Sequence, residues 1–386
     1  MPHKAMWIYA WDLQEEGTEK VVRELAGDVG INALALANAY HSVEHLRPRA
    51  KGAKVFRSEQ AALYYEPDLS FYSQTKLRHR VSPIVKEKPV LPDFVEACEK
   101  HRVRPESWTV VCHNSFLGSG NPDCVETNVY GDFLVHALCP ANPDVRAYAV
   151  ALCRDLESQG IEIIELESLS FHGFGHAHHH TKFGVDFGGA AVLFGLCFCS
   201  HCRSRAASRG VDVAELVQAI ERELDSVLAA GHSDKILTDY LEDLPGLRDY
   251  LRVRQETVTS LLQEIKDAVS IQVNFLLMGD EYRAGFDFAA LAEIADQVEV
   301  LAYTPSAGRV TEIIQTTCEK TGTDELVIGY SVYKPMTPDE QTLEQNVQAA
   351  LDVGVSSFSF YNYGIMPPEN LKWVTRAAAA IDAAAG

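Results

Sequence analysis

Three cysteines lie within six residues, at Cys197, Cys199 and Cys202. A Cys-x-Cys-x-x-Cys run on a tight turn can direct three sulfur atoms at one point, which suits a tetrahedral zinc site that lacks one ligand. Free cysteine also packs in cores as a small apolar side chain, so three unrelated buried thiols are the alternative. Polar neighbours, His201 among them, are untypical of a core segment and favour the metal.

A second group of reactive side chains lies in the apolar segment 161–167. In a strand, period-two alternation places Glu165 and Glu167 on the same face. Two carboxylates facing inward are costly to bury without a partner or a use. Like charges this close raise one pKa, as a general acid near neutral pH requires. We therefore expect Glu167, at the strand end, to be catalytic. Glu165 is a candidate substrate contact, with a salt-bridged structural role as the alternative.

Five histidines follow this segment at positions 172, 176, 178, 179 and 180. Imidazoles can bind a catalytic metal or contact a substrate. Side chains adjacent in sequence diverge in direction in most backbones, so a metal site made of these histidines alone is the less favoured reading. We expect one or two of them, with His172 and His179 as candidates, to contact substrate or hydrogen-bond Glu167.

The elements that must position these residues alternate along the chain. Eight β-rich runs, most of them apolar on both faces, are predicted as strands of a covered parallel sheet. They span residues 7–11, 33–37, 109–113, 161–167, 271–277, 298–303, 327–332 and 356–361. Helical patterns fall at residues 20–26, 91–100, 143–159, 214–230, 244–268, 288–295, 310–321, 338–353 and 368–384.

This alternation predicts an α/β fold of the (β/α)8 or TIM-barrel type, as a single domain over residues 1–386. An open doubly wound sheet is the alternative, but no Gly-x-Gly-x-x-Gly turn follows the first strand. Two connections, 41–89 after strand two and 168–212 after strand four, are too long for plain loops. Both should lie over the C-terminal mouth of the barrel, where barrel enzymes build their sites.

Other strand ends supply further candidates for that mouth. A second catalytic group is expected among Asp12, His113 and Asp280. Aromatic faces stack on the C–H surfaces of sugars, while amide and imidazole groups bind hydroxyls. The remaining candidate substrate contacts are Trp11, His41, Asn114, Tyr303, Tyr330, Tyr361 and Asn362. Strand seven, 327–332, contains no carboxylate, which disfavours a retaining mechanism with a nucleophile there.

Composition restricts the partners. The chain is 47% hydrophobic and 23% charged, so a large core is expected. A net charge of −20 argues against nucleic acid and anionic membrane surfaces as partners. No stretch reaches the length of a membrane span, and the first residues show no signal-peptide pattern. Nine cysteines, an odd number, indicate metal rather than disulfides and a reducing cytoplasm.

In two of its segments the chain resembles glycoside hydrolase family 42, the zinc-bearing TIM-barrel β-galactosidases. Residues 196–203 are similar to that family's Cys-aromatic-Cys-x-x-Cys-Arg loop. Residues 138–146 resemble the Cys-Pro-x-x-Pro-x-x-Arg segment that supplies the fourth zinc thiolate. The resemblance implies a structural zinc held by Cys139, ahead of Cys124, together with the three clustered thiols. It also implies that Glu167 is the general acid.

Two departures mark the chain as a divergent relative. The family's Asn-Glu pair on strand four is Leu166-Glu167 here, and its strand-seven Glu nucleophile has no counterpart. With Cys139 as fourth ligand the zinc is coordinatively closed, which makes it a brace for the loop after strand four.

We therefore predict a cytoplasmic glycoside hydrolase acting on a small glycoside or oligosaccharide. Glu167 would protonate the leaving oxygen while Asp12 or Asp280 activates water, which favours inversion; a variant pairs Asp12 with His113. The alternatives are a non-catalytic carbohydrate-binding barrel and a metal-dependent hydrolase using residues 172–180. The partner is a small carbohydrate, with no nucleic acid or membrane; the sequence leaves homo-oligomers open.

Overall fold

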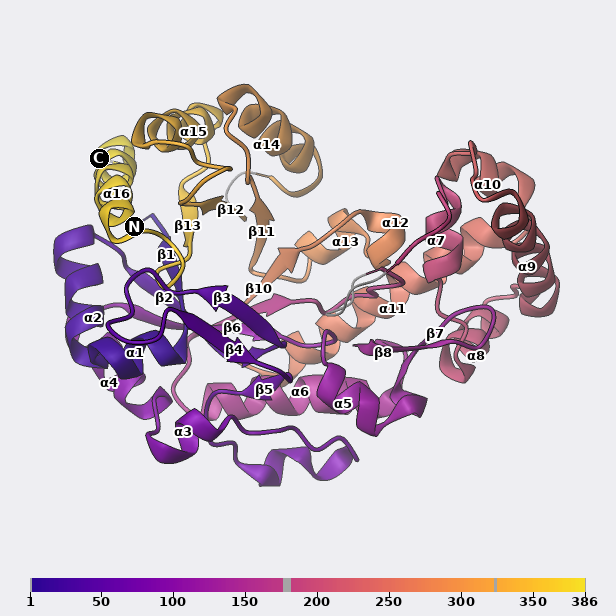
Figure 1. The fold of residues 1–386 in the computed structure, drawn as a ribbon, viewed down its shortest axis with the longest axis horizontal. Coiled ribbons are helices and arrows are strands. Elements are labelled where there is room, and N and C mark those ends of the chain that lie inside the picture. Colours follow the sequence, from indigo (N-terminus) through magenta and orange to yellow (C-terminus); the bar gives the residue numbers. More distant parts are fainter. Residues whose placement is uncertain (1, 176–181, 323–324, 386) are drawn as a thin grey trace.

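Eight parallel strands close into a barrel surrounded by helices in a computed structural model that describes residues 2–175, 182–322 and 325–385. The strands run in the order β1-β13-β12-β11-β10-β9-β6-β2, and pairing of β1 with β2 closes the ring. The predicted TIM barrel is thereby confirmed (Figure 1). The barrel strands are β1 (Lys4–Ile8), β2 (Ala33–Tyr40), β6 (Arg104–Val110), β9 (Ile163–Glu167), β10 (Gln272–Leu277), β11 (Gln297–Leu301), β12 (Leu326–Ser331) and β13 (Ser357–Tyr361).

Two strands lie earlier in the chain than predicted. The first, expected at 7–11, is Lys4–Ile8, so that Asp12 belongs to helix α1 (Ala10–Glu16) rather than to a strand end. The third, expected at 109–113, ends at Val110, so His113 and Asn114 lie beyond it. In both places the chain stays buried past the last strand residue. Apolar character therefore marked burial but not the point where ladder hydrogen bonding ends.

The helices that cover the barrel lie close to the predicted ranges. Their starts follow ordinary capping chemistry: Asn142 accepts hydrogen bonds from the backbone N–H groups of Asp144 and Val145, and Pro143 occupies the first position of α6. The covering helices are α2 (Thr18–Glu24), α4 (Leu91–His101), α6 (Pro143–Ser158), α11 (Leu247–Ala268), α13 (Phe288–Ala292), α14 (Ala307–Thr321), α15 (Glu340–Val353) and α16 (Leu371–Ala385).

The connection after β2 folds over the barrel mouth. It begins with an antiparallel hairpin of β3 (Val43–Leu46) and β4 (Val55–Ser58). Strand β5 (Ala62–Leu63) then pairs with β2. The 3₁₀-helix η2 (Leu69–Gln74) and helix α3 (Pro83–Glu87) complete the segment, and Figure 1 shows the hairpin drawn across the barrel strands.

The chain also leaves the barrel after β6 and after β9. The first excursion contains α5 (Ser115–Gly120), η3 (Pro122–Cys124), β7 (Val125–Thr127) and β8 (Phe133–Leu138). The second contains α7 (Ala190–Gly195), α8 (Ser200–Ser208), α9 (Val213–Ala230) and α10 (Leu237–Asp243). Helices α7–α10 and the start of α11 enclose a second hydrophobic core beside the barrel core, so this excursion extends beyond the expected 168–212 (Figure 1).

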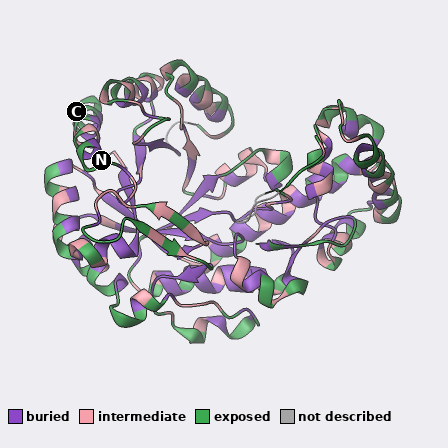
Figure 2. Ribbon diagram, in the orientation of Figure 1, coloured by how far each residue is buried: buried purple, intermediate pink, exposed green. Residues whose placement is uncertain are grey.

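Buried and exposed residues occupy different parts of the fold. Buried residues concentrate on the barrel strands and on the inner sides of the helices, while exposed residues cover the outer helices (Figure 2). Among the described residues, no helix combines the length and apolar character that crossing a membrane requires. The cytoplasmic location stays a prediction.

Candidate functional site

A cavity of about 630 Å³ opens at the C-terminal ends of the barrel strands. Its size falls in the usual range for small-molecule sites. The β3–β4 hairpin supplies one side, with Glu44 and His45 in the lining. Aromatic side chains on or just after five strands form much of the wall, namely Trp7, Tyr9, Tyr40, Trp108, Tyr303 and Tyr361. The cavity thus offers apolar ring faces of the kind that stack on sugars.

Glu167 is the buried carboxyl group of this cavity. It ends β9, and one of its oxygens, Oε2, accepts a hydrogen bond of 2.5 Å from Trp108 Nε1. Burial raises the pKa of Glu167 to about 7, although the hydrogen bond from Trp108 acts in the opposite direction. A carboxyl group with such a pKa is partly protonated near neutral pH, as a general acid must be. Glu167 thus lies at the barrel mouth, where the sequence predicted it.

Three tyrosine hydroxyls meet beside this carboxyl group. The Tyr9 hydroxyl lies 3.2 Å from that of Tyr40 and 3.2 Å from that of Tyr361. Burial raises the pKa of Tyr9, Tyr40 and Tyr361, and the nearby Glu167 adds to the effect in Tyr40 and Tyr361. All three therefore remain neutral hydroxyls at ordinary pH. A neutral hydroxyl can both donate and accept, which suits it to the hydroxyl groups of a carbohydrate.

Glu165 lies inside the barrel, behind Trp7, and does not line the cavity. Its Oε2 accepts a 2.6 Å hydrogen bond from Trp7 Nε1, and the carboxyl group is hydrogen-bonded to that of Glu299 on β11. Burial, followed by the charge of Glu299, raises the pKa of Glu165 well above its usual value. No cation lies within ion-pair distance of Glu165 among the residues described, so the salt-bridged alternative is not observed. Instead, Glu165 is hydrogen-bonded to the carboxyl group of Glu299, a contact that requires one of the two groups to be protonated.

Two further carboxyl groups in the barrel interior were missed by sequence reasoning. Glu299 accepts a hydrogen bond from Ser359, and Glu106 on β6 is fully enclosed near Glu165. A Cβ atom on Gly329 would lie 2.8 Å from Glu299 Oε1, so the strand-seven glycine makes room for this carboxyl group. Glu299 lies two residues before Leu301, which lines the cavity, so the period of two places both side chains on the inner face of the strand. This alternation could have revealed Glu299 as an inward-facing carboxyl group.

Histidines form a row along one side of the cavity. His41 and His172 line it, and the His113 ring lies between them, 4.7 Å and 5.1 Å from their ring centroids. His113 itself is buried and absent from the lining. The predicted contact His179 lies outside the described residues. In the described parts of the chain, the grouping with metal-binding geometry is made of cysteines rather than histidines.

The two predicted second carboxylates occupy different surroundings. Asp280 lines the cavity and caps α12 (Glu281–Ala284), with Oδ1 accepting from the backbone N–H of Arg283 at 2.9 Å. Asp12 is buried in α1, 3.5 Å from Arg47 Nε, and does not line the cavity. Burial raises the pKa of Asp12 to about 7, with Arg47 opposing the rise. A Cβ on Gly364 would overlap the Asp12 carboxyl group, which therefore packs against the chain after β13.

Of the aromatic and amide candidates, Tyr303 and Tyr361 line the cavity, whereas four others do not. Those four have local structural partners. The partners are the Phe56 ring for Trp11, the backbone N–H of Leu117 for Asn114, the carbonyl oxygen of Asn346 for Tyr330 and the backbone N–H of Gly364 for Asn362. Sequence reasoning missed five aromatic residues of the lining, namely Trp7, Tyr9, Tyr40, Trp108 and Phe171. Strands one and three were placed too late in the chain, which affected Trp7, Tyr9 and Trp108, and strand two was ended before Tyr40.

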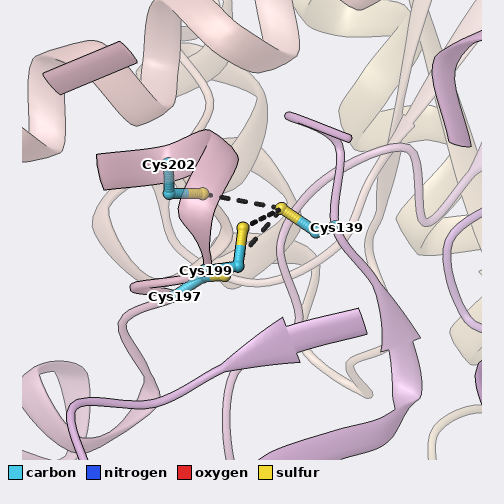
Figure 3. Close-up of side chains that lie close together, drawn as sticks. All are labelled: Cys139, Cys197, Cys199 and Cys202. Carbon is cyan, nitrogen blue, oxygen red and sulfur yellow. Dashed lines mark hydrogen bonds between the residues drawn. The ribbon is translucent and has the colours of Figure 1, made fainter. Parts of the chain in front are cut away.

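The four predicted zinc ligands come together, as Figure 3 shows. Cys139 Sγ lies 3.6 Å from that of Cys199, 3.5 Å from that of Cys202 and 3.8 Å from that of Cys197. With zinc–sulfur bonds of about 2.3 Å, a regular tetrahedron has sulfur–sulfur edges of about 3.8 Å. The four thiols can therefore hold a metal ion without large rearrangement.

The contacts around these thiols would also support a bound metal ion. The backbone N–H of Thr127, at the end of β7, points to Cys197 Sγ at 3.3 Å, a contact that orients and stabilises a thiolate. The carbonyl oxygen of Cys197 accepts a hydrogen bond from Tyr250 on α11. The Phe198 ring, between two of the cysteines, stacks on Tyr250 in the second core. A metal here would join the barrel to that second core.

A hydrogen-bonded link runs from the cysteine cluster to the cavity. Glu126, on β7 next to Thr127, is buried and accepts hydrogen bonds from the backbone N–H groups of His172 at 2.6 Å and Gly173 at 3.3 Å. Burial raises the pKa of Glu126 to about 7, against the pull of these two hydrogen bonds. The position of cavity-lining His172 thus depends on the strand that also contacts the thiols.

Comparison with known proteins shows the fold. No protein-family model and no curated protein sequence matches the chain. Among solved structures, β-galactosidase from the psychrophilic Marinomonas ef1 is similar, with a TM-score of 0.60 and 8% sequence identity. The match covers 98% of this chain and 59% of the galactosidase chain. The α-L-fucosidase isoenzyme 2 from Paenibacillus thiaminolyticus matches 99% of this chain and 50% of its own, with a TM-score of 0.59 and 10% identity. The Ostrinia furnacalis Group IV chitinase matches 99% of this chain and 100% of its own, with a TM-score of 0.52 and 9% identity.

These structural neighbours are named glycosidases that share the barrel fold at low sequence identity. The chain spans between half and three-fifths of the length of the galactosidase and the fucosidase. Membership of glycoside hydrolase family 42 stays a prediction.

Proposed function

We propose that the protein is a glycoside hydrolase whose general acid is Glu167. The observation that carries the proposal is a buried carboxyl group, with its pKa raised to about 7, in an aromatic cavity at the mouth of the barrel. A proton on Glu167 can pass to the oxygen of a leaving group, because that oxygen gains negative charge as the glycosidic bond breaks. The barrel neighbours named as glycosidases support the same reading.

The second group we assign is Asp280, which lines the cavity, in preference to the enclosed Asp12. One oxygen of Asp280 caps α12, and the carboxyl group is exposed to solvent at the rim of the cavity, so a water molecule can reach it. In this arrangement Asp280 takes a proton from the attacking water, and the anomeric configuration inverts. Carboxyl groups of Glu167 and Asp280 about 6.5–9.5 Å apart in a sugar complex would agree with this role.

The substrate class that the cavity favours is a small glycoside or the end of an oligosaccharide. Trp7 and Trp108 offer ring faces to one sugar, with their indole N–H groups engaged by Glu165 and Glu167. The hydroxyl groups of Tyr9, Tyr40 and Tyr361 then lie within the same aromatic wall for polar contacts. Apolar faces with a few convergent polar groups are typical of carbohydrate sites.

We further propose that the metal on Cys139, Cys197, Cys199 and Cys202 is zinc with a structural role. Four thiolates fill a tetrahedral coordination shell and leave no position for water or substrate. The cluster would then support the chain that carries His172 rather than take part in the reaction.

The test is hydrolysis of a panel of aryl glycosides by the wild-type protein and by Glu167→Gln. We expect kcat to fall at least about 100-fold, because the amide cannot donate the proton, with sugar binding retained. Glu162→Gln is the matched control, since Glu162 lies near the start of the same strand, is exposed and pairs with Arg104. Full activity in Glu167→Gln would contradict the assignment. Sugar binding without any turnover would instead favour a non-catalytic carbohydrate-binding barrel. The absence of a carboxylate from strand seven, β12, is the observation that supports this alternative.

A further inference from the structure

A second pocket of about 620 Å³ is separate from the proposed active site. It lies between α5, the chain after β4 and the segment that follows η2. Three of its lining side chains are basic: Lys76, Arg78 and His136. None of the proposed catalytic groups belongs to it.

Two connections place this pocket next to the main cavity. His136 lines the second pocket, and its ring lies 6.2 Å from that of His113, which in turn is 5.1 Å from cavity-lining His172. The β3–β4 segment makes the other connection, because β3 lines the main cavity while Glu59 and Gln60, directly after β4, line the second pocket. The two pockets are therefore neighbours, and the buried His113 ring lies between the His136 side of one and the His172 side of the other.

The guanidinium of Arg78 is the group in this pocket best suited to an anion. Its Nη1 donates to the carbonyl oxygens of Thr75 at 2.6 Å and Leu77 at 3.0 Å, which fixes the side chain against its own loop. No carboxylate oxygen lies within 4 Å of Arg78 among the described residues, although the chain as a whole is strongly acidic. Its remaining N–H groups can form the paired hydrogen bonds that a planar carboxylate accepts.

The other charges of the pocket are largely paired. Lys76 Nζ contacts the carboxylate of Asp123 and lies 4.0 Å from that of Asp144. Glu59, which also lines the pocket, has a side chain that is 76% exposed and lies 3.7 Å from Arg57. Ser115, Ser119 and Asn121 add hydroxyl and amide groups to the lining, and Phe116 adds a ring. This combination of an anchored cation with polar groups and an aromatic ring fits a charged sugar.

We propose that the second pocket is a binding subsite for a sugar unit that carries a carboxylate, so that the preferred substrate is an oligosaccharide containing a uronic acid. This inference rests on the proposed glycosidase function and names its substrate class. Arg78 binds the carboxylate, while the glycosidic bond to be cleaved lies in the main cavity at Glu167.

The test compares Arg78→Met with the wild type in two measurements. Calorimetry measures binding of D-galacturonate, D-galactose and inorganic phosphate, and kinetics compare uronate-containing with neutral oligosaccharides. We expect wild-type protein to bind galacturonate more tightly than galactose or phosphate. Arg78→Met should lose this preference and raise KM for acidic oligosaccharides at least about tenfold with kcat little changed, since the contact is remote from the bond broken. Arg80→Met, a cation outside the pocket lining, is the matched control.

The outcomes separate the subsite from the proposed function. Hydrolysis of neutral glycosides that depends on Glu167, together with no effect of Arg78→Met on any acidic ligand, would overturn the subsite and leave the glycosidase standing. Galacturonate binding that requires Arg78 in a protein without turnover would support the subsite and refute the glycosidase. Equal binding of phosphate and galacturonate would overturn the subsite as a sugar site.

Discussion

Glu167 is the residue on which the proposed chemistry depends, and two opposing influences set its pKa. Burial in the cavity favours the neutral acid, whereas the indole N–H of Trp108 favours the carboxylate. The balance leaves the pKa at about 7, so the acid can both hold and release a proton near neutrality. A general acid is active in its protonated form, and kcat should therefore fall as pH rises through about 7.

Substitution of Trp108 tests this balance. In Trp108→Phe the ring remains but the N–H is lost, so the pKa of Glu167 should rise and the alkaline limb of kcat should move to higher pH by roughly one unit. The measurement is kcat as a function of pH, over a range that includes both the acid and the alkaline limb of the profile. Trp373→Phe, on outer helix α16, serves as control and should leave the profile unchanged. An alkaline limb that stays in place in Trp108→Phe would show that the hydrogen bond does not tune Glu167.

At the scale of elements, the cysteine cluster connects two segments that are far apart in the sequence. Cys139 follows β8, Cys197 and Cys199 lie between α7 and α8, and Cys202 lies in α8. Strand β7 contacts the cluster through Thr127 and holds the backbone of His172 through Glu126. Loss of the metal should therefore loosen this part of the fold first and affect the cavity only as a consequence.

Cys199→Ser tests the order of these effects. We expect the metal content to fall and the free energy of unfolding to drop by at least about 2 kcal/mol, because metal binding contributes directly to folding. At temperatures well below the Tm of the variant, the folded protein should keep most of its activity even though its free energy of unfolding is reduced. Cys318→Ser, a partly buried thiol outside the cluster, is the control. Lost activity in a fully stable Cys199→Ser protein would contradict a structural role for the metal.

At the scale of the whole molecule, the barrel interior holds carboxyl groups where most barrels hold branched apolar side chains. Burial raises the pKa of Glu106, Glu165 and Glu299, and each lies on a different barrel strand. The native state therefore binds more protons than the unfolded chain between the ordinary carboxyl pKa of 4.5 and about 7. Stability should fall as pH rises through this window, since ionisation has to occur inside the barrel.

Partly buried histidines act in the opposite direction. Burial lowers the pKa of His3, His45 and His79 to about 4, so the unfolded chain binds more protons below pH 6.5. The histidine contribution to stability therefore falls as pH drops from 6.5 towards 4, and it opposes the carboxyl contribution over the range that the two share.

Glu299→Gln tests the carboxyl contribution. An amide of the same shape cannot ionise, so the loss of stability between pH 6 and pH 8 should become smaller by on the order of 1 kcal/mol. The measurement is urea unfolding at both pH values. Glu242→Gln, on the exposed side of α10, should keep the wild-type pH dependence. An unchanged difference in Glu299→Gln would mean that Glu299 is not protonated in the folded barrel.

The sequence by itself determined the features that depend on local spacing. The Cys-x-Cys-x-x-Cys run marked three of four thiols in one cluster, alternation in strand four brought Glu167 to the mouth, and the repeated strand-helix pattern predicted the barrel. The first two follow from a spacing or a period within one short segment, and the third follows from the order of such segments along the chain. The alternation could not show that Glu165 is paired with another carboxyl group, because that partner belongs to a strand far along the chain.

Only the tertiary structure decided which side chains meet. Tyr9, Tyr40 and Tyr361 stand at the ends of strands from the beginning and the end of the chain, and they touch because β1 pairs with both β2 and β13. Trp108 reaches Glu167 because β6 pairs with β9. Barrel closure sets these neighbours through hydrogen bonds between strands, and no periodicity within a single strand records its partners.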